Sequence, residues 1–175
     1  MAQKMARYFI IAALFFFLVG CIEGIMFPTK LRFQWFYATL MHIPPEHLKL
    51  FFGDFVKRIH THINLIGWVS SALMGILYYL VPQIQGNERY SVWVCYTNFW
   101  CHIAGIVLFC VGFHLIGSFG LASGFAHGTP EFRKVVEPFK PVVLAGGALI
   151  LMSALFFSYN MFKTLLGSKG NQNYG

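Results

Sequence analysis

Charged side chains are scarce in this sequence of 175 residues. They make up 11% of the chain, and only six of them are Asp or Glu. A soluble domain of this size usually carries about 25% charged residues. The hydrophobic residues, 57% of the total, lie in long apolar runs, which is the pattern of a membrane protein. The composition therefore argues against a soluble globular domain.

Several sequence patterns that would indicate a particular chemistry are also missing. The chain has no phosphate-binding loop, no catalytic Ser or Cys triad and no cysteine spacing typical of a zinc site. It has no Cys-x-x-Cys-His, so covalent attachment of a c-type haem is not indicated. The four cysteines all fall inside apolar runs, where they are interpreted as small buried residues: Cys21, Cys95, Cys101 and Cys110. We identify no catalytic residue.

The balance of charge is basic, with a net charge of +7 and a pI near 9.4. The basic residues flank the apolar runs, where they meet lipid headgroups and help to set orientation. Haem propionates are another candidate partner for them. We therefore expect a lipid bilayer, and not a nucleic acid, as the environment of this chain.

The apolar runs predict an all-α, antiparallel four-helix bundle that forms one membrane domain over residues 1–175. The predicted spans are residues 8–27, 59–81, 92–118 and 142–166, each near or above the roughly 20 residues that cross a bilayer. Pro28 and Pro82 are expected to end the first two spans. The first run is too long for the apolar part of a signal peptide and is read as a retained span. Residues 167–175 form a polar tail.

A long aromatic connection joins the first two spans over residues 31–56. Its part from 45 to 56 has apolar residues at helical spacing, namely Leu48, Phe51, Phe52 and Phe55. This spacing predicts an amphipathic helix at the membrane interface.

Seven histidines are many for a small membrane protein, and six of them gather at one membrane face. His60 and His62 lie near the start of the second span, and His114 lies near the end of the antiparallel third span. The long connections on that side hold His42, His47 and His127, while His102 lies deeper in the third span. Glu23 lies near the same face. Ionisable groups within spans are costly to insert and suggest function by default.

The spacing of His60 and His62 decides what they can bind together. Residues i and i+2 of a helix point about 200° apart, so the two rings cannot easily share one metal ion. They can ligate two cofactors on opposite faces of the helix, since neutral histidine is a common ligand of haem iron. The alternative is a pair of interfacial histidines that form hydrogen bonds with lipid headgroups and bind no cofactor.

The other candidates are weaker. His114 and His102 are candidate haem ligands, with interhelical hydrogen bonding as the alternative. The loop histidines His42, His47 and His127 are candidate metal ligands, for copper among others, although surface histidines are usually just solvated. Glu23 is either a proton relay or a partner of Arg, His or water.

The stretch from His60-Thr-His62 to Gly67-Trp68-Val69, continuing to Tyr78-Tyr79 and Pro82, resembles the tenth helix of the haem-copper oxidase catalytic subunit. The likeness is greatest to C-type oxidases and bacterial nitric oxide reductases. Two further stretches resemble the eleventh and twelfth helices, one around Asn98-Phe99-Trp100 and one from Pro138-Phe139 to Tyr159-Asn160.

The resemblance implies that His60 ligates a high-spin haem and His62 a low-spin haem. The family's second low-spin ligand and its copper or iron ligands come from earlier helices without counterparts here. We therefore do not expect oxygen or nitric oxide reduction by this chain alone. The family's twelve helices form three arcs of four, and this chain resembles the last arc.

These observations lead to a first hypothesis of a haem b-binding membrane subunit that transfers electrons within a respiratory or redox complex. The alternatives are a non-catalytic module that binds a metal such as copper, or a gas, and a structural subunit without a cofactor. We expect other membrane subunits, or two further copies in a homotrimer, to cover the open side of the arc.

The expected location is the cytoplasmic membrane of a bacterium or archaeon. A simple count of basic residues places the two long connections inside. The resemblance implies the opposite orientation, with both termini in the cytoplasm, and we follow it.

Overall fold

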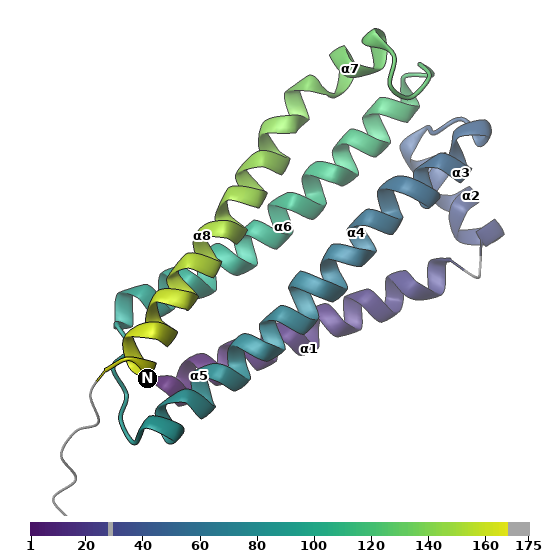
Figure 1. Ribbon diagram of the computed structural model, residues 1–175. Coiled ribbons are helices and arrows are strands. Elements are labelled where there is room, and N and C mark those ends of the chain that lie inside the picture. Colours follow the sequence, from purple (N-terminus) through teal and green to yellow (C-terminus); the bar gives the residue numbers. More distant parts are fainter. Residues whose placement is uncertain (28–29, 168–175) are drawn as a thin grey trace, which may run out of the picture.

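The computed structural model describes residues 1–27 and 30–167, and every element in these ranges is a helix (Figure 1). Four helical runs are long and apolar enough to cross a membrane: Ala2–Ile25, Pro45–Gln85, Val92–Ala122 and Pro130–Leu165. This result confirms the predicted all-α, four-helix membrane architecture. The predicted stop at Pro28 and nearly all of the predicted polar tail lie outside the described residues.

The first span is α1 (Ala2–Met26), and the short helix α2 (Lys30–Met41) follows it. The second span is one long helical run with changes of pitch, and its parts are η1 (Pro45–His47), α3 (Leu48–Leu50), η2 (Phe51–Val56), α4 (Lys57–His62), η3 (Ile63–Ser70) and α5 (Ser71–Gln85). The third span is α6 (Val92–Ala122). The fourth is preceded by α7 (Pro130–Val136) and η4 (Glu137–Phe139) and is formed by α8 (Lys140–Leu165).

The connection between the first two spans differs in detail from the predicted interfacial segment. Residues 45–56 are helical, but they extend the second span instead of forming a separate helix. Phe51, Phe52 and Phe55 are buried in a cluster with Leu121 and Phe132 from the third and fourth runs. Because these aromatic side chains find protein partners, the segment stays in line with the span.

Pro82 does not end the second span, contrary to the prediction. Helix α5 continues to Gln85 and ends at Gly86, which has a left-handed conformation with φ of 68°. A proline lacks the N–H that would bond the carbonyl four residues earlier, which here belongs to Tyr78. The hydroxyl of Tyr90 lies 3.4 Å from that carbonyl oxygen and donates to it. A side chain thus replaces the missing donor, and the helix tolerates the proline.

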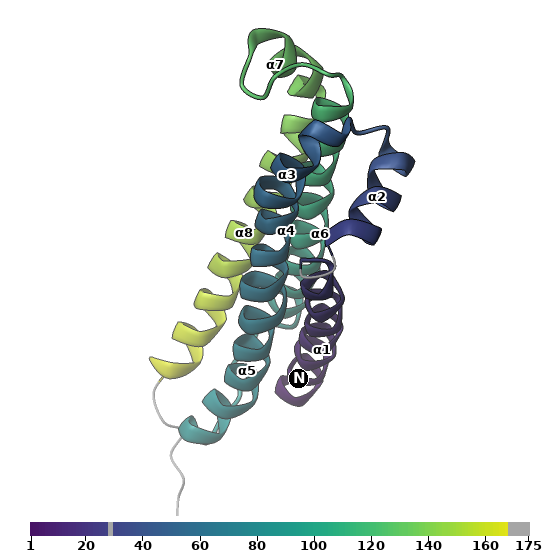
Figure 2. The same cartoon turned by 90° about the vertical axis from the view of Figure 1, so that its right-hand side faces the viewer.

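The spans pack mainly as two pairs, α1 with the second run and α6 with α8 (Figures 1 and 2). The second pair is close because α8 carries glycine where it crosses α6. A Cβ atom at Gly146 would lie 2.5 Å from the backbone nitrogen of Phe109. Only glycine permits this approach.

The two ends of the bundle differ. Helices α2, α3 and α7 gather at one end, and the start of α1 and the α5–α6 loop lie at the other (Figures 1 and 2). The histidine-bearing helix α4 lies toward the first end. The packing therefore places most of the predicted site residues in one half of the molecule.

Candidate functional site

His62 is the histidine whose ring is best prepared to bind a metal. Its Nδ1 atom lies 2.7 Å from the backbone oxygen of Arg58, one turn earlier. A ring nitrogen that donates to a carbonyl keeps its proton, which leaves the lone pair of Nε2 available. The ring lies against α6, with its centroid 4.5 Å from that of Phe109 and 6.3 Å from that of Phe113. Nε2 has no hydrogen-bond partner among the described residues.

His60 lies on the other side of the same helix, toward α1. Its Nδ1 atom is 3.6 Å from Oε2 of Glu23, and Nδ2 of Asn64 lies 3.3 Å from Nδ1 and 3.4 Å from Nε2. The ring of Phe27 packs edge-on at 5.3 Å. The edge of the imidazole that carries both nitrogens is therefore occupied by protein groups, unlike that of His62.

Glu23, on α1, is the carboxylate that faces His60. Its Oε2 atom is buried and makes no hydrogen bond among the described residues, so the ring of His60 is its closest polar neighbour that the structure shows. Gly20 lets the Asn64 side chain approach α1, because a Cβ there would lie 2.5 Å from the Asn64 oxygen. Glu23, His60 and Asn64 thus form a polar contact between the first two spans.

The two π-helical segments lie on either side of this histidine pair. Segment η2 ends at Val56 and segment η3 begins at Ile63, so the regular helix between them is only α4. Single π turns are found frequently at functional sites. Both histidines lie in the regular helix α4, where residues i and i+2 point about 200° apart, and this spacing directs them toward different helices.

The deep histidine, His102, already has a polar partner. Its Nε2 atom lies 2.9 Å from the hydroxyl oxygen of Ser71 on α5, and its ring packs edge-on against Phe9 of α1 at 5.7 Å. Only 1% of the residue is exposed. The structure therefore places it as an interhelical hydrogen-bonding residue, although its buried Nδ1 atom has no hydrogen-bond partner among the described residues.

His114 is likewise occupied, by a residue of the aromatic connection. The hydroxyl of Tyr37, on α2, lies 2.5 Å from its Nε2 atom and 3.2 Å from its Nδ1 atom. Both rings contact Phe51. Binding of iron by His114 would require Tyr37 to move.

The loop histidines are not brought together. His127 lies between the rings of Phe55 and Phe132. His42 directly follows α2 with φ of 52°, and His47 lies in η1. Over residues 1–27 and 30–167, no three His, Cys, Asp or Glu side chains are arranged to hold a metal ion.

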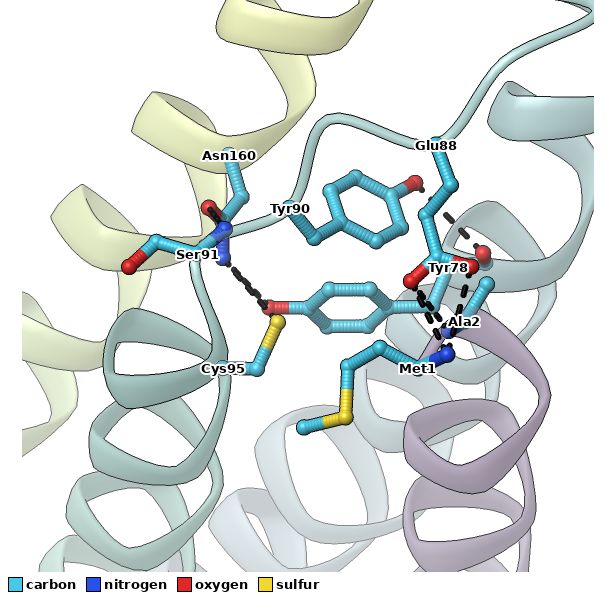
Figure 3. Close-up of polar contacts among 8 residues, drawn as sticks. All are labelled: Met1, Ala2, Tyr78, Glu88, Tyr90, Ser91, Cys95 and Asn160. Atoms are coloured by element: carbon cyan, nitrogen blue, oxygen red, sulfur yellow. Dashed lines mark hydrogen bonds and ion pairs between the residues drawn. The ribbon is translucent and has the colours of Figure 1, made fainter.

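Sequence reasoning missed a second polar cluster at the other end of the bundle. The hydroxyl of Tyr78 accepts from Nδ2 of Asn98 at 2.9 Å and from Nδ2 of Asn160 at 3.4 Å. Ser153 donates to Asn98 at 2.6 Å, and the backbone of Ser91 donates to Asn160 at 3.3 Å. Figure 3 shows part of this network.

A pattern in the second span was the available signal for this cluster. Asn64, Ser71 and Tyr78 recur every seven residues, which places polar groups on one face of a membrane helix. Each finds a polar partner in the structure. Ser71 and Tyr78 join the second span to α6 in this way, whereas Asn64 donates to the backbone oxygen of His60 in its own helix. Buried polar groups need such partners in an apolar environment.

The matches to known proteins all lead to the same family. The sequence model of the family described as "Cytochrome C and Quinol oxidase polypeptide I" matches residues 4–174. The chain is 30% identical over 122 residues to "Cbb3-type cytochrome c oxidase subunit CcoN1" of Stutzerimonas stutzeri, which covers 63% of this chain and 25% of the relative. It is 32% identical over 115 residues to "Cytochrome c oxidase subunit 1 homolog, bacteroid" of Bradyrhizobium diazoefficiens, covering 61% and 21%.

A third relative, "Cytochrome c oxidase subunit 1 homolog" of Agrobacterium tumefaciens, is 26% identical over 117 residues, covering 62% of this chain and 22% of the relative. The chain thus spans a quarter or less of the length of these relatives. No solved structure matches the chain.

Proposed function

The chain belongs to the cytochrome c and quinol oxidase polypeptide I family, and from this membership we propose that it is a haem b-binding subunit that transfers electrons within a respiratory or redox membrane complex. It is a multi-pass membrane protein related to haem-copper oxidases. The observation that carries the haem assignment is the free Nε2 atom of His62, whose other ring nitrogen contacts a backbone carbonyl.

The surroundings of His62 fit a porphyrin. Two phenylalanine rings, of Phe109 and Phe113, lie beside the imidazole, and flat apolar surfaces of this kind pack well against a macrocycle. Lys57 and Arg58 lie one turn earlier, and both are exposed. The ammonium of Lys57 is suited to neutralise a propionate group, whereas Arg58 is already paired with Asp54 at 2.8 Å. Haem iron held by His62 would supply one-electron redox cycling.

His60 is proposed as the second haem ligand only if its ring turns away from Glu23 and Asn64, because those side chains occupy its nitrogens. His114 and His102 are proposed ligands under a similar condition, since Tyr37 and Ser71 hold them. For copper, the loop histidines His42, His47 and His127 would need ligands beyond the described residues.

One observation favours the second candidate function, a gas-binding module. The aromatic rings in contact with His62 are phenylalanines, and His114 and His102 have other hydrogen-bond partners. A haem held by His62 alone would keep an open iron position for a small gas. A reduced-minus-oxidised spectrum with and without carbon monoxide separates the two functions, because only the five-coordinate form shifts.

The proposed location is the cytoplasmic membrane of a bacterium or archaeon, with both termini in the cytoplasm. The three relatives named above come from bacteria, which supports a bacterial membrane as the location. Other membrane subunits are the proposed partners, with a homotrimer as the alternative. Helix α2 supports a docked subunit because its Trp35, Phe36 and Leu40 are largely exposed.

The test of the haem assignment is the His62→Ala variant, purified from a membrane and examined by optical and electron paramagnetic resonance spectroscopy. We expect it to lose the low-spin haem signal while still inserting, because the iron loses its protein ligand. His127→Ala is the matched control and should leave the haem signals unchanged, because His127 is a candidate ligand for copper only. Retention of haem with an unaltered spectrum in His62→Ala would contradict the assignment.

The His60→Ala variant tests whether the chain binds one haem or two. If each histidine binds its own haem, this variant should alter a signal that His62→Ala leaves in place. Loss of the same single signal in both variants would show that the chain holds one haem.

A further inference from the structure

Among the hollows around the first turns of α1, at the end of the bundle away from the histidines, three adjoin one another. The middle hollow, of about 530 Å³, is lined by Lys4, Arg7 and Tyr8 among others. An apolar groove of about 540 Å³ lies between α1 and α5, and another of about 550 Å³ lies between α1 and α6. Ile11 lines all three, so the hollows adjoin one another on the surface of one helix.

The middle hollow carries positive charge without a compensating carboxylate in its lining. Arg7 is exposed and has no hydrogen-bond or ion-pair partner among the described residues. The ammonium of Lys4 lies near the rings of Tyr8 and Tyr96, at 5.8 and 5.5 Å from their centroids, and it pairs with no carboxylate among the described residues. Glu88, on the neighbouring loop, already accepts from the backbone of Ala2 at 3.0 Å (Figure 3).

The two grooves are apolar and follow the helix into the membrane. Ile76 and Leu80 line the α5 side, and Phe15 and Phe99 line the α6 side. Tyrosines such as Tyr8 and Tyr96 are enriched at the headgroup level of a bilayer, which places the cations at that level and the grooves at the depth of acyl chains.

We propose that this surface is a specific site for one anionic phospholipid. Its phosphate binds Lys4 and Arg7, and its two acyl chains lie on either side of α1, one in each groove. A phospholipid fits better than a quinol, because a neutral headgroup would leave both cations unpaired. It also fits better than a second copy of the chain, because a like-charged surface would oppose two such cations. The lipid would hold α1 against both α5 and α6.

Native mass spectrometry of the purified full chain in mild detergent tests the site, with phosphatidylglycerol and phosphatidylcholine of identical acyl chains as probes. We expect one phosphatidylglycerol to be retained in preference to phosphatidylcholine. Lys4→Gln and Arg7→Gln should each weaken phosphatidylglycerol binding about fivefold, the value for one basic residue near an anionic membrane surface. Binding of phosphatidylcholine should change little.

The control is Lys163→Gln, in the last turn of α8, the helix that ends at the same end of the bundle as the start of α1 (Figure 1). Its ammonium lies over the ring of Tyr159, and the residue lines none of these three hollows. This variant should bind both lipids as the unaltered chain does. Ile76→Trp, which obstructs the α1–α5 groove, should weaken binding of both lipids. Circular dichroism verifies that each variant keeps its helices.

Three results would overturn the proposal. They are equal retention of the two lipids, an equal loss in Lys163→Gln and Arg7→Gln, and a quinol or a second copy of the chain in place of the lipid. All four substituted side chains are exposed, so the test does not depend on the haem or on the core.

Discussion

At the scale of single residues, this protein stabilises an irregular helix through one tyrosine. Tyr90 donates to the Tyr78 carbonyl that Pro82 leaves without an N–H partner. Tyr90 is buried, and burial raises the pKa of its phenol above the ordinary value. The hydroxyl therefore remains a donor at any physiological pH. A carbonyl without a donor in a membrane span would cost free energy.

Tyr90→Phe should lower the free energy of unfolding by about 1 kcal/mol, the typical net value of one hydrogen bond. In a Pro82→Ala background, the same change should cost much less, because the alanine N–H then serves the Tyr78 carbonyl. Denaturant unfolding in detergent micelles, followed by circular dichroism, measures this double-mutant cycle. Tyr79→Phe, at an exposed position, is the control. An equal cost of Tyr90→Phe in both backgrounds would show that the hydroxyl acts elsewhere, for instance on the sulfur of Met161, 3.8 Å away.

At the residue scale the difference between His60 and His62 also becomes clear. Both are histidines of one short helix, yet one contacts a carboxylate and an amide while the other keeps Nε2 free. The two side chains are chemically identical, but His60 faces α1 and His62 faces α6. The packing of the helices therefore determines which of the two histidines has a ring nitrogen available for a metal.

At the scale of elements, the crossing of α6 and α8 depends on small residues. Gly105 and Gly146 face each other, and a Cβ atom at Gly105 would lie 2.9 Å from the backbone nitrogen of Ile150. Helices without a hydrophobic driving force between them associate through such close backbone contact. The neighbouring Gly147 has nothing within 4 Å of its Cβ position, so it offers a matched comparison.

Gly146→Ala should destabilise the bundle by about 1–3 kcal/mol, the usual cost of an added methyl group in a packed interface. Gly147→Ala should change stability by no more than about 1 kcal/mol, toward greater stability, since alanine favours a helix. Thermal unfolding of both variants in the same detergent makes the comparison. Equal effects of the two substitutions would mean that α6 and α8 are farther apart than the structure places them.

At the scale of the whole molecule, orientation in the membrane sets which side the histidine-bearing end faces. We expect the loop that holds His127 to lie outside the cytoplasm and both termini inside. A single cysteine at Ala126, in a chain whose four native cysteines are replaced by alanine, should react with a membrane-impermeant maleimide from the outer side only. A cysteine at Asn87, in the α5–α6 loop, should show the reverse. Labelling of position 126 from the cytoplasmic side alone would favour the count of basic charges.

Assembly is the second question at this scale. Many large apolar side chains of the spans are exposed, among them Ile11, Leu14, Phe15 and Leu18 on α1. A haem bound at the partly exposed His62 would lie near the surface of a lone chain, where polar iron ligands are costly in lipid. We therefore expect the haem-loaded form to be part of a larger assembly. Native mass spectrometry from mild detergent should show it, whereas a haem-loaded 19.9 kDa species that is stable on dilution would mean that the chain closes its own site.

The sequence by itself determined the class of the protein and the approximate limits of its spans. Hydropathy is a local property, so runs such as 92–118 and 142–166 identify α6 and α8 within a few residues. The resemblance to haem-copper oxidases also depends on contiguous residues, beginning with His60 and His62, and the family match confirmed it. The stop expected at Pro82 failed because the compensating donor, Tyr90, lies in the next loop.

Only the tertiary structure decided which polar groups meet. The partners of His102, His114 and His60 are Ser71, Tyr37 and Glu23, and each lies 31 or more residues away along the chain. Periodicity places a side chain on a face of its own helix, but it does not say which other helix covers that face. The free nitrogen of His62 and the grooves beside α1 follow from how the helices pack, because in a membrane small residues and polar contacts select the neighbours.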